Sequence, residues 1–402
     1  MDDRDATSLS VLQRFQAQFL RTQASSTTTT HLTLETHSEN SRAKSRAWVT
    51  TGGTGGIAQM HTGRASGGQT DMGSPPGVTP VQHPACPVCQ GATTVPFAMT
   101  RHKYRSLSED RARGTLVREF LHCMHCDACF VNPVNYISDE EAKRRYAEHE
   151  NDPQDSRYVK FLGQAINPLL CDLLERFGSL TAQSVSSASG ADAPSQPAPA
   201  IRFEEKDPES DRAVSKVLSR LSGMDYGCGP GPAVSYHFGE RWNANVINYD
   251  PTFYPLDLSP YDGALDFVVC TEVLEHVAEP QETASQLLQL VRSPMPRTDG
   301  TSLPSGVLCI MTGIFARKEM PRSPFSRPEV DAFLKWAYTR DPTHIVFYQA
   351  STLELLFLRA FNRLSSSTMR FSTLSVRIRQ DPACKNVFLI DLVPKAQVNE
   401  SV

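Results

Sequence analysis

The sequence lacks any long hydrophobic run. No segment approaches the roughly 18 consecutive apolar residues that a membrane-spanning helix requires. The N-terminus also has no short apolar core of the kind that a secretory signal carries. Asp2, Asp3 and Asp5 argue against an organellar transit peptide, although Arg14 and Arg21, before a Ser/Thr run, leave that option open. We therefore expect a cytoplasmic protein with no membrane anchor.

A strong charge of either sign is missing as well. Lys and Arg total 40 against 44 Asp and Glu, which gives a net charge of −4, so the overall charge does not attract nucleic acid or an anionic membrane. Hydrophobic residues make up 40% of the chain, which predicts a folded part diluted by polar segments. The 402 residues leave room for two domains and tails, at roughly 100–200 residues per domain.

The polar segments lie at the N-terminus and in the middle of the chain. Residues 1–82 are rich in Ser, Thr and Gly and have no sustained period, which predicts a disordered tail with one short helix at 11–21. Residues 181–210 begin with a Ser/Ala/Pro-rich stretch, which predicts a flexible linker or an inserted loop.

The segment 136–180 is predicted to be a helical connector. Ser138 and Glu141 have the spacing of a capping box. Helical apolar spacing continues after them, and we expect it to be interrupted near Pro168.

From residue 211 to residue 396 the pattern alternates between strands and helices. This alternation predicts an α/β fold with a mostly parallel sheet that is covered by helices on both faces. A helix is also expected from Ser351, with Glu354 as its capping-box partner. The expected strands end at Asp225 and Asp250 and cover 265–270, 306–312 and 386–393, and another helix is expected at 281–292.

The stretch "MDYGCGPGP", residues 224–232, predicts a ligand-binding turn at the end of the first strand. Gly227, Gly229 and Gly231 let the chain turn sharply and let a ligand lie against bare backbone. The motif is not the GxGxxG of nicotinamide enzymes, which disfavours an oxidoreductase. Asp225 would repel a phosphate but could hold an ammonium group. A glycine-rich turn without a ligand is the alternative interpretation.

Asp250 follows the next strand, 23 residues after Gly227. An acid at this place can accept hydrogen bonds from both hydroxyls of a ribose. The alternative is that Asp250 only opens a turn with Pro251. Together with the glycine turn, Asp250 favours a nucleoside site.

The ten cysteines are distributed unevenly, with five close together and five scattered in apolar segments. The CxxC pairs Cys86/Cys89 and Cys123/Cys126 predict a tetrahedral structural zinc site in a zinc-ribbon-like module at 83–135. Cys129, His122 or His125 could replace a ligand, and a degenerate ribbon or a thiol pair is the alternative. We interpret the cysteines as metal ligands and small core residues rather than as disulfides, which indicates a reducing compartment.

A spacer of 33 residues separates the two CxxC pairs. It contains Arg101, Lys103 and Arg105, which could grip RNA. Glu109 and Asp110 lie in the same spacer and no aromatic stacking platform is evident. We therefore favour a solvated loop.

Several segments resemble class I S-adenosylmethionine (SAM)-dependent methyltransferases. They are "MDYGCGPGP", "VINYDPTFYP", "LDFVVCTEVLEHV" and "WAYTRDPTHIVFY". More narrowly, the chain is similar to a largely uncharacterised group with an N-terminal CxxC…CxxC segment and a Tyr-x-x-His-x-Asn linker, matched here within "RYAEHENDPQDSRYVKFL". The resemblance covers roughly residues 84–180 and 220–395, and it implies a Rossmann-like catalytic domain at 211–396 and an acceptor side that includes 136–180.

The resemblance implies that SAM is the cofactor. The residues that it places around SAM are Asp225, Gly227, Cys228, Gly229 and Gly231 at the turn, Asp250 at the ribose, and Thr271 and Glu272 in the pocket after the strand at 265–270. Only 14 residues separate Asp250 from Leu265, so we expect the usual third strand and its helix to be reduced or absent. The acid that often contacts adenine has no counterpart that can be assigned.

His344 and Asp341 are the candidate catalytic residues. Methyl transfer needs a positioned acceptor and, for a hydroxyl or amine, a base, and His titrates near neutral pH. Similar families often place a His-x-x-Phe segment beside the acceptor, which fits His344 and Phe347. The alternative is that His344 only bonds the backbone of its own loop.

Glu272, Glu275 and His276 would share one face of a helix. The segment resembles one in ubiquinone-pathway O-methyltransferases, where these positions are implied to hold a divalent cation, here magnesium. We favour the alternative that Glu272 lines the donor pocket and that the other two cap the helix.

The sequence therefore predicts a SAM-dependent methyltransferase that acts on a small-molecule acceptor. One alternative is an RNA methyltransferase whose zinc ribbon grips nucleic acid. The other is a non-catalytic module that binds SAM or a metal. The acceptor, the atom that is methylated and the oligomeric state do not follow from the residues.

Overall fold

The computed structural model describes residues 83–103, 115–148, 151–182, 202–296, 302–318 and 321–395. The expected N-terminal tail at 1–82, residues 183–201 of the linker and residues 104–114 of the spacer between the CxxC pairs lie outside these ranges. Among the described helices, none has the length and apolarity to cross a bilayer.

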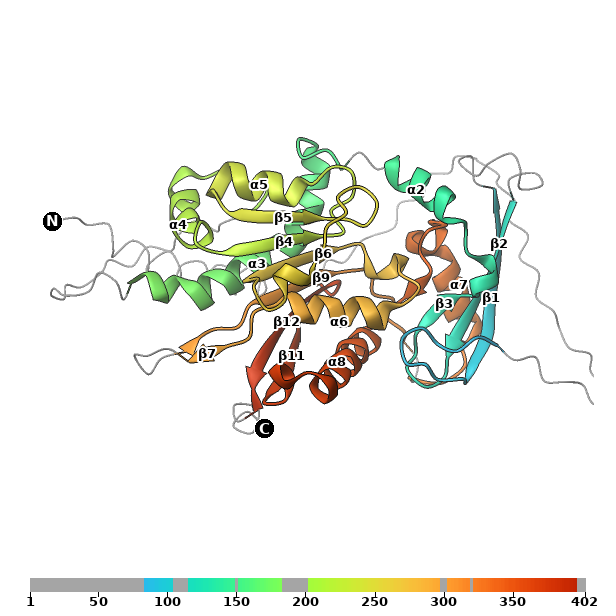
Figure 1. Cartoon of the computed structure of the whole chain (residues 1–402). Coiled ribbons are helices and arrows are strands. Elements are labelled where there is room, and N and C mark those ends of the chain that lie inside the picture. Colours follow the sequence, from blue (N-terminus) through green and yellow to red (C-terminus); the bar gives the residue numbers. More distant parts are fainter. Residues whose placement is uncertain are drawn as a thin grey trace, which may run out of the picture. The chain divides into compact units, whose positions relative to one another are not determined.

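The larger sheet has six strands in the order β11-β12-β9-β6-β4-β5 (Figure 1). The four strands β5, β4, β6 and β9 are parallel, and β12 and β11 complete the sheet as antiparallel neighbours. The strands are β4 (Ser222–Tyr226), β5 (Asn245–Tyr249), β6 (Phe267–Thr271), β9 (Val307–Met311), β11 (Leu374–Gln380) and β12 (Val387–Pro394).

Alternating side chains of the central strands fill two separate cores, as the period of a strand requires. Phe267 and Val269 of β6 pack with α3 (Ser156–Ala182), α4 (Pro208–Leu218) and α5 (Ala233–Trp242). Val268 and Cys270 pack with the opposite layer, α6 (Pro280–Leu290) and α8 (Ala350–Ser367). Figure 1 shows the two helical layers on either side of the sheet. The predicted α/β class with helices on both faces is confirmed.

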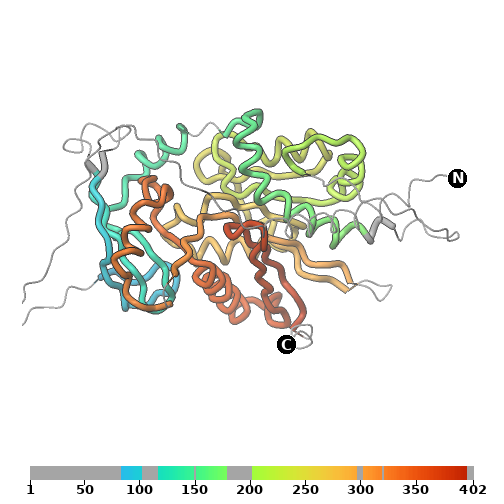
Figure 2. Tube along the Cα trace, turned by 180° about the vertical axis from the view of Figure 1, so that it is seen from behind, coloured from blue at the N-terminus to red at the C-terminus, as the bar shows by residue number. Residues whose placement is uncertain are grey.

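A smaller sheet contains the cysteine segment. Its strand order is β1-β2-β3-β10, and all neighbours are antiparallel. The strands are β1 (Thr94–Lys103), β2 (Thr115–Cys123), β3 (Cys129–Val131) and β10 (Val346–Phe347). The last strand comes from the C-terminal part of the chain. Helix α7 (Arg327–Lys335) lies beside this sheet, as the trace in Figure 2 shows. Phe333 of α7 contacts Phe97 of β1.

The remaining described elements are short. They are α2 (Asp139–Ala147), β7 (Met295–Pro296), β8 (Ser302–Leu303), and the 3-10 turns η1 (Pro133–Asn135), η2 (Ser259–Tyr261), η3 (Leu274–His276), η4 (Ala337–Arg340) and η5 (Met369–Phe371). Between β5 and β6 the described residues contain only η2, so the expected loss of the third strand and its helix is confirmed.

Local patterns gave one correct and two wrong predictions about helices. The capping box of Ser138 and Glu141 is present at α2. Pro168 does not interrupt α3, because Ile166 and Leu169 on either side of it are buried in the same core and hold the helix together. Helix α8 begins at Ala350 after Gln349, with no side-chain cap, so the predicted Ser351–Glu354 capping box is wrong.

Candidate active site and metal centre

The glycine turn follows β4 at the carboxyl edge of the parallel strands, where α/β sheets bind ligands. Gly227 and Gly229 have φ angles of 76° and 66°, a region that other residues rarely adopt. The amides of Gly227 and Cys228 both donate to the carbonyl of Tyr249, over 2.7 and 3.1 Å. A Cβ on Gly227 would lie 2.4 Å from Cγ2 of Val273. Gly227 therefore has both a conformational and a steric reason to be glycine.

Asp250 bonds the glycine turn to its own loop. Its Oδ2 accepts the amide of Gly229 over 3.2 Å. Its Oδ1 accepts the amides of Thr252 and Phe253 over 2.8 and 3.0 Å. Asp250 thus opens a turn before Pro251, as the alternative interpretation expected. It also holds the glycine turn, which the nucleoside-site interpretation places beside the ligand.

Asp225 is almost fully buried at the end of β4. Burial, with a further contribution from the charge of Asp250, raises the pKa of its carboxyl to about 7. A buried carboxyl beside a turn of bare backbone can bind a cationic group, because such a group compensates the charge that burial disfavours.

Thr271 is the last residue of β6, the neighbour of β4, and Glu272 follows it. Glu272 has a φ of 54°, which is strained for a residue with a side chain, and its amide donates to the carbonyl of Met311 over 2.8 Å. Burial and the neighbouring Glu275 raise the pKa of Glu272 to about 9. The next residue, Val273, is the one that crowds Gly227, so these residues lie against the glycine turn.

Glu272, Glu275 and His276 do not share one helical face. Only Leu274–His276 form a 3-10 turn, η3, and Glu272 precedes it in a left-handed conformation. The prediction of a helix here is wrong, because a residue in the left-handed conformation cannot be part of a right-handed helix.

Glu275 and two histidines form a cluster beside this turn. Glu275 is fully buried, and its carboxylate accepts hydrogen bonds from the hydroxyls of Thr312, over 2.9 Å, and Tyr338. The rings of His276 and His344 are 4.7 Å apart between centroids. One ligand atom of each of the three residues lies within 4.8 Å of the others.

Both histidine rings are oriented by backbone carbonyls. Nδ1 of His276 lies 3.1 Å from the carbonyl of Thr343, and Nδ1 of His344 lies 2.8 Å from that of Tyr338. Because a carbonyl only accepts, each Nδ1 carries a hydrogen and each Nε2 keeps its lone pair while the ring is neutral. Such a pair, beside a carboxylate, can accept a proton or bind a divalent metal.

Burial, opposed by the charge of Glu275 but aided by His276, lowers the pKa of His344 to about 4. Asp341 is bonded within its own loop: Thr343 donates from its amide over 2.9 Å, and Arg145 donates over 2.9 Å. Burial opposes ionisation of Asp341, but His344, Thr343 and Arg145 together hold its pKa well below the usual range. His344 thus faces His276 and also bonds its loop backbone, whereas the Asp341 carboxylate is surrounded by loop contacts.

Four residues near the site were not singled out as site residues. Tyr338 bonds Glu275, and the ring of Tyr146 meets that of His276 at 5.2 Å between centroids. Asn151 lies against Gly229, and the charge of Asp225 acts on the nearby Tyr158. Tyr146 and Asn151 belong to the Tyr-x-x-His-x-Asn match, which was the available signal, whereas His149 of that match lies outside the described residues.

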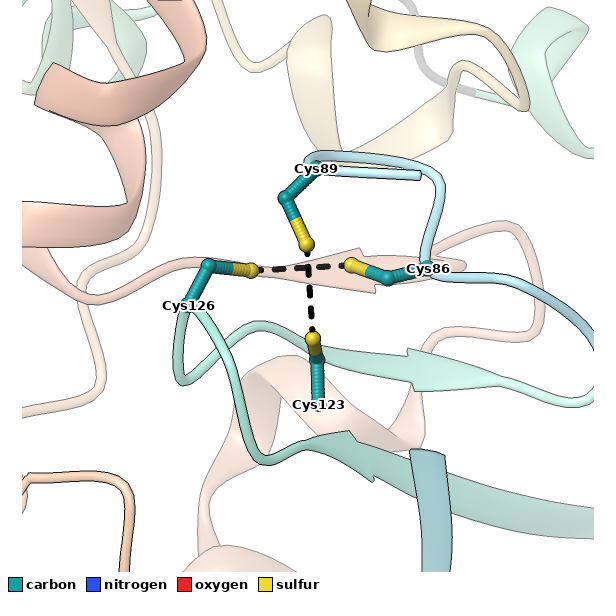
Figure 3. A group of neighbouring side chains, drawn as sticks. All are labelled: Cys86, Cys89, Cys123 and Cys126. Atoms are coloured by element: carbon teal, nitrogen blue, oxygen red, sulfur yellow. Dashed lines mark hydrogen bonds between the residues drawn. The ribbon is translucent and has the colours of Figure 1, made fainter. Parts of the chain in front are cut away.

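The four predicted cysteine ligands converge (Figure 3). Sγ of Cys86 is 3.6 Å from Sγ of Cys126, and Sγ of Cys89 is 3.5 Å from Sγ of Cys123. A disulfide would need about 2.05 Å, while a tetrahedron of Zn–S bonds of about 2.3 Å has sulfur separations of about 3.8 Å. The spacing and the all-sulfur donor set therefore fit a structural zinc ion.

The two CxxC turns have the same backbone geometry. Gln90 and Asp127, each directly after a second cysteine, have φ angles of 59° and 61°. Their amides donate back to the carbonyls of Cys86 and Cys123 over 2.8 and 2.9 Å. In the first turn, the amide of Gly91 also donates to Sγ of Cys89 over 3.4 Å. Such paired turns present two sulfurs each, which is what a tetrahedral site requires.

The proposed substitutes for these ligands lie elsewhere. Cys129 is buried in β3, and Nε2 of His122 lies 3.0 Å from Oδ1 of Asp127. Residues 90–103 and 115–122 of the spacer are described; Arg101 is exposed, and Arg105 lies outside the described residues. The structure therefore gives no RNA-binding arrangement for the spacer within the described residues.

One comparison with known protein families identifies a domain in this chain. Residues 169–362 match the family model of a methyltransferase domain, Methyltransf_23. Residues 169–362 thus carry a methyltransferase domain. No curated protein matches the chain.

Solved structures similar to this chain include three bacterial proteins. They are a predicted O-methyltransferase from Nostoc punctiforme (11% identity, 46% of this chain and 56% of that one, TM-score 0.26), YcgJ from Bacillus subtilis (13%, 40% and 64%, 0.24) and a SAM-dependent methyltransferase from Thermotoga maritima (12%, 45% and 86%, 0.24). The alignments thus cover less than two thirds of the first two proteins, and the domain assignment rests on the family model.

Proposed function

We propose that this domain transfers the methyl group of SAM to a small molecule and that the histidine pair His276 and His344 receives the proton that the acceptor releases. The observation that carries the proposal is the position of the pair. His276 is the last residue of η3, which follows β6, and His344 lies in the loop before β10. Val273, at the start of the same segment after β6, lies against the glycine turn, and the Nδ1 atoms of both histidines are bonded to carbonyls.

The donor would lie against the glycine turn. Asp225 is suited to the ammonium group of SAM, because a buried carboxyl gains most from a cation. Asp250 is suited to a ribose hydroxyl, although its existing bonds to Gly229, Thr252 and Phe253 leave it few free lone pairs. Cys228, Gly231, Thr271 and Glu272 complete the proposed donor residues.

In the transfer, an acceptor atom displaces the sulfur in line, the S–CH3 bond breaks, and S-adenosylhomocysteine leaves. The acceptor proton goes to a histidine Nε2, and Glu275 stabilises the imidazolium that results. Tyr338 and Thr312 hold Glu275 in place, so the carboxylate needs no reorganisation. We assign Asp341 to holding the loop rather than to proton transfer.

Zinc would be held by Cys86, Cys89, Cys123 and Cys126. A zinc ion bound by four thiolates has no open position, so its contribution is folding energy for the segment. None of the proposed chemistry depends on a ligand exchanging at this ion.

Release of S-adenosylhomocysteine from SAM tests the function. The zinc-loaded protein is incubated with panels of phenols, amines and acidic carbon acids, and in a separate arm with total RNA. We expect turnover with at least one small molecule, and we expect this turnover to require both His276 and His344. Turnover with RNA alone would favour the nucleic-acid alternative, and binding of SAM without turnover in either arm would favour the non-catalytic module.

A further inference from the structure

Arg118 joins the smaller sheet to the loop that carries His344. It lies in β2 and is fully buried. Nη1 donates to the carbonyls of Thr339 and Asp341 over 2.8 and 2.9 Å, and Nη2 donates to the carbonyl of His344. One side chain therefore fixes three carbonyls along a loop that has little regular structure.

The same loop is held on both flanks by backbone bonds. The amide of Val131 donates to the carbonyl of Ile345 over 2.8 Å, and β10 continues the contact by pairing with β3. On its other flank, the amide of Ile345 donates to the carbonyl of Glu275 over 2.7 Å. Residues 339–347, here called the histidine loop, thus carry His344 and lie between β3 of the smaller sheet and Glu275.

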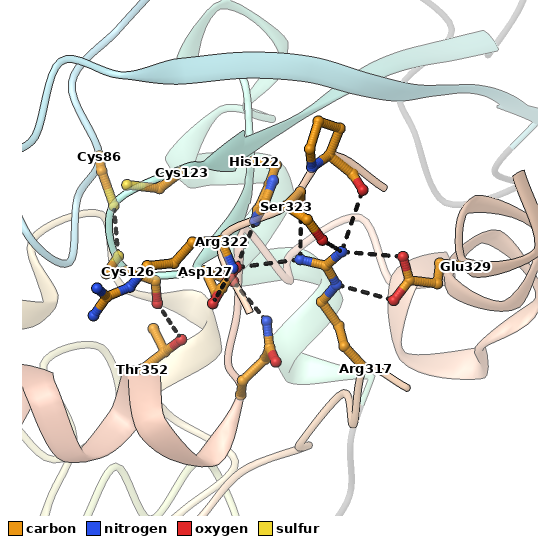
Figure 4. A network of polar contacts seen from close by, with 12 residues as sticks. Cys86, His122, Cys123, Cys126, Asp127, Arg317, Arg322, Ser323, Glu329 and Thr352 are labelled. Atoms are coloured by element: carbon orange, nitrogen blue, oxygen red, sulfur yellow. Dashed lines mark hydrogen bonds and ion pairs between the residues drawn. The ribbon is translucent and has the colours of Figure 1, made fainter. Parts of the chain in front are cut away.

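The second CxxC turn is the connection between the two strands that hold this loop. β2 ends at Cys123, and β3 begins at Cys129. Asp127 in that turn accepts hydrogen bonds from Arg317, over 3.2 Å, and from the amide of Arg322, over 2.7 Å (Figure 4). Arg317 also pairs with Glu329 of α7 over 3.0 Å. The predicted zinc site therefore lies in a connected set of polar contacts, not in a detached module.

We infer that Arg118 is a positioning residue for methyl transfer and that the cysteine module exists in this chain to hold the histidine loop in its reactive geometry. This inference rests on the proposed function of the histidine pair. A guanidinium suits the task because its planar donors reach several carbonyls at fixed angles, which an ammonium group does not. A misplacement of about 1 Å at a reacting group can cost on the order of 10²-fold in rate.

Arg118→Met and Arg118→Lys test the inference in the zinc-loaded full chain. Arg101→Met is the matched control, because Arg101 lies on β1 of the same sheet and is exposed. Hydrogen exchange of the histidine loop and of residues 224–232, zinc content, the Kd for SAM, and kcat and KM are measured for each variant.

We expect Arg118→Met to speed exchange of the histidine loop and to lower kcat on the order of 10²-fold. The Kd for SAM, the exchange of residues 224–232 and the zinc content should stay as in the control. Arg118→Lys should lie between the two. If Arg118→Met does not fold, the decision rests on Arg118→Lys, where loop exchange and kcat equal to those of Arg101→Met overturn the inference.

The outcomes also separate this inference from the proposed function. Failure of the wild type to bind SAM or to turn over any acceptor counts against the function, whereas the exchange of the histidine loop is measured without turnover. Loss of SAM binding in Arg118→Met together with faster exchange throughout the chain would mean a general structural role and would overturn the positioning role.

Discussion

At the scale of a single residue, we expect Asp225 to make the affinity for SAM depend on pH. Its pKa is about 7 because it is buried and because the charge of Asp250 also disfavours its ionisation, so below pH 7 it is largely protonated in the free protein. Binding of an ammonium group requires the ionised carboxylate. We expect the affinity for SAM to rise about tenfold per pH unit between pH 5 and 7 and to level off above.

Isothermal titration across this range measures the effect, and Asp225→Asn should remove the pH dependence. The same raised pKa has a consequence for stability. Since the folded protein binds this proton and the unfolded chain does not, the free protein should lose stability as the pH rises from 3.8 to about 7. An affinity that is independent of pH in the wild type would contradict the role given to Asp225.

The histidine pair is the second test at this scale. His276→Gln and His344→Gln keep polar side chains but cannot accept a proton, so each should lower kcat roughly 10²- to 10⁴-fold with little change in the Kd for SAM. His237→Gln is a matched control, since His237 lies in α5 and bonds the carbonyl of Pro153. Turnover of both variants at the rate of the control would exclude the pair from proton transfer.

At the scale of elements, the turn after β4 depends on the absence of a side chain. Gly227→Ala should destabilise the protein by at least about 1–2 kcal/mol, because a left-handed conformation alone costs that much for alanine. The new Cβ would also clash with Val273, which increases the cost. Gly239→Ala is the contrast. Its Cβ would meet open space within α5, so it should stabilise the protein by up to about 1 kcal/mol. Urea unfolding distinguishes the two, and equal effects would contradict this account of the turn.

The two CxxC turns give a prediction about metal content. Cys126→Ser should lose bound zinc and melt at a lower temperature, because a ligand is gone from a closed site. Cys129→Ser changes a buried cysteine only three residues away that lies in β3, so its zinc content should stay at that of the wild type. Metal analysis of the purified variants tests this assignment. Loss of zinc from Cys129→Ser but not from Cys126→Ser would mean that Cys129, not Cys126, is the fourth ligand.

At the scale of the whole molecule, the sequence predicted features that short spacings determine. The glycine turn, the CxxC pairs and the alternation of strands and helices are visible in the letters because each depends on neighbours along the chain. The missing third strand was predictable for the same reason, from the short distance between Asp250 and Leu265.

Contacts between distant segments were not predictable. Nothing in the spacing of His276 and His344 says that the two rings meet, and nothing near Arg118 says that it reaches the histidine loop. β10 is too short to show a strand pattern in the sequence, and it is a strand because it pairs with β3. The helix expected at Glu272 does not form because this residue has a left-handed backbone, which its local sequence did not indicate.

The central claim is that the carboxyl edge of this sheet binds SAM. Calorimetric titration of the zinc-loaded protein with SAM and S-adenosylhomocysteine tests it most directly, with Asp250→Ala and Gly227→Val as variants and Gly239→Ala as the control. We predict saturable binding of both ligands to the wild type and the control, and its loss in both variants. A folded, zinc-loaded protein that binds neither ligand would contradict the claim.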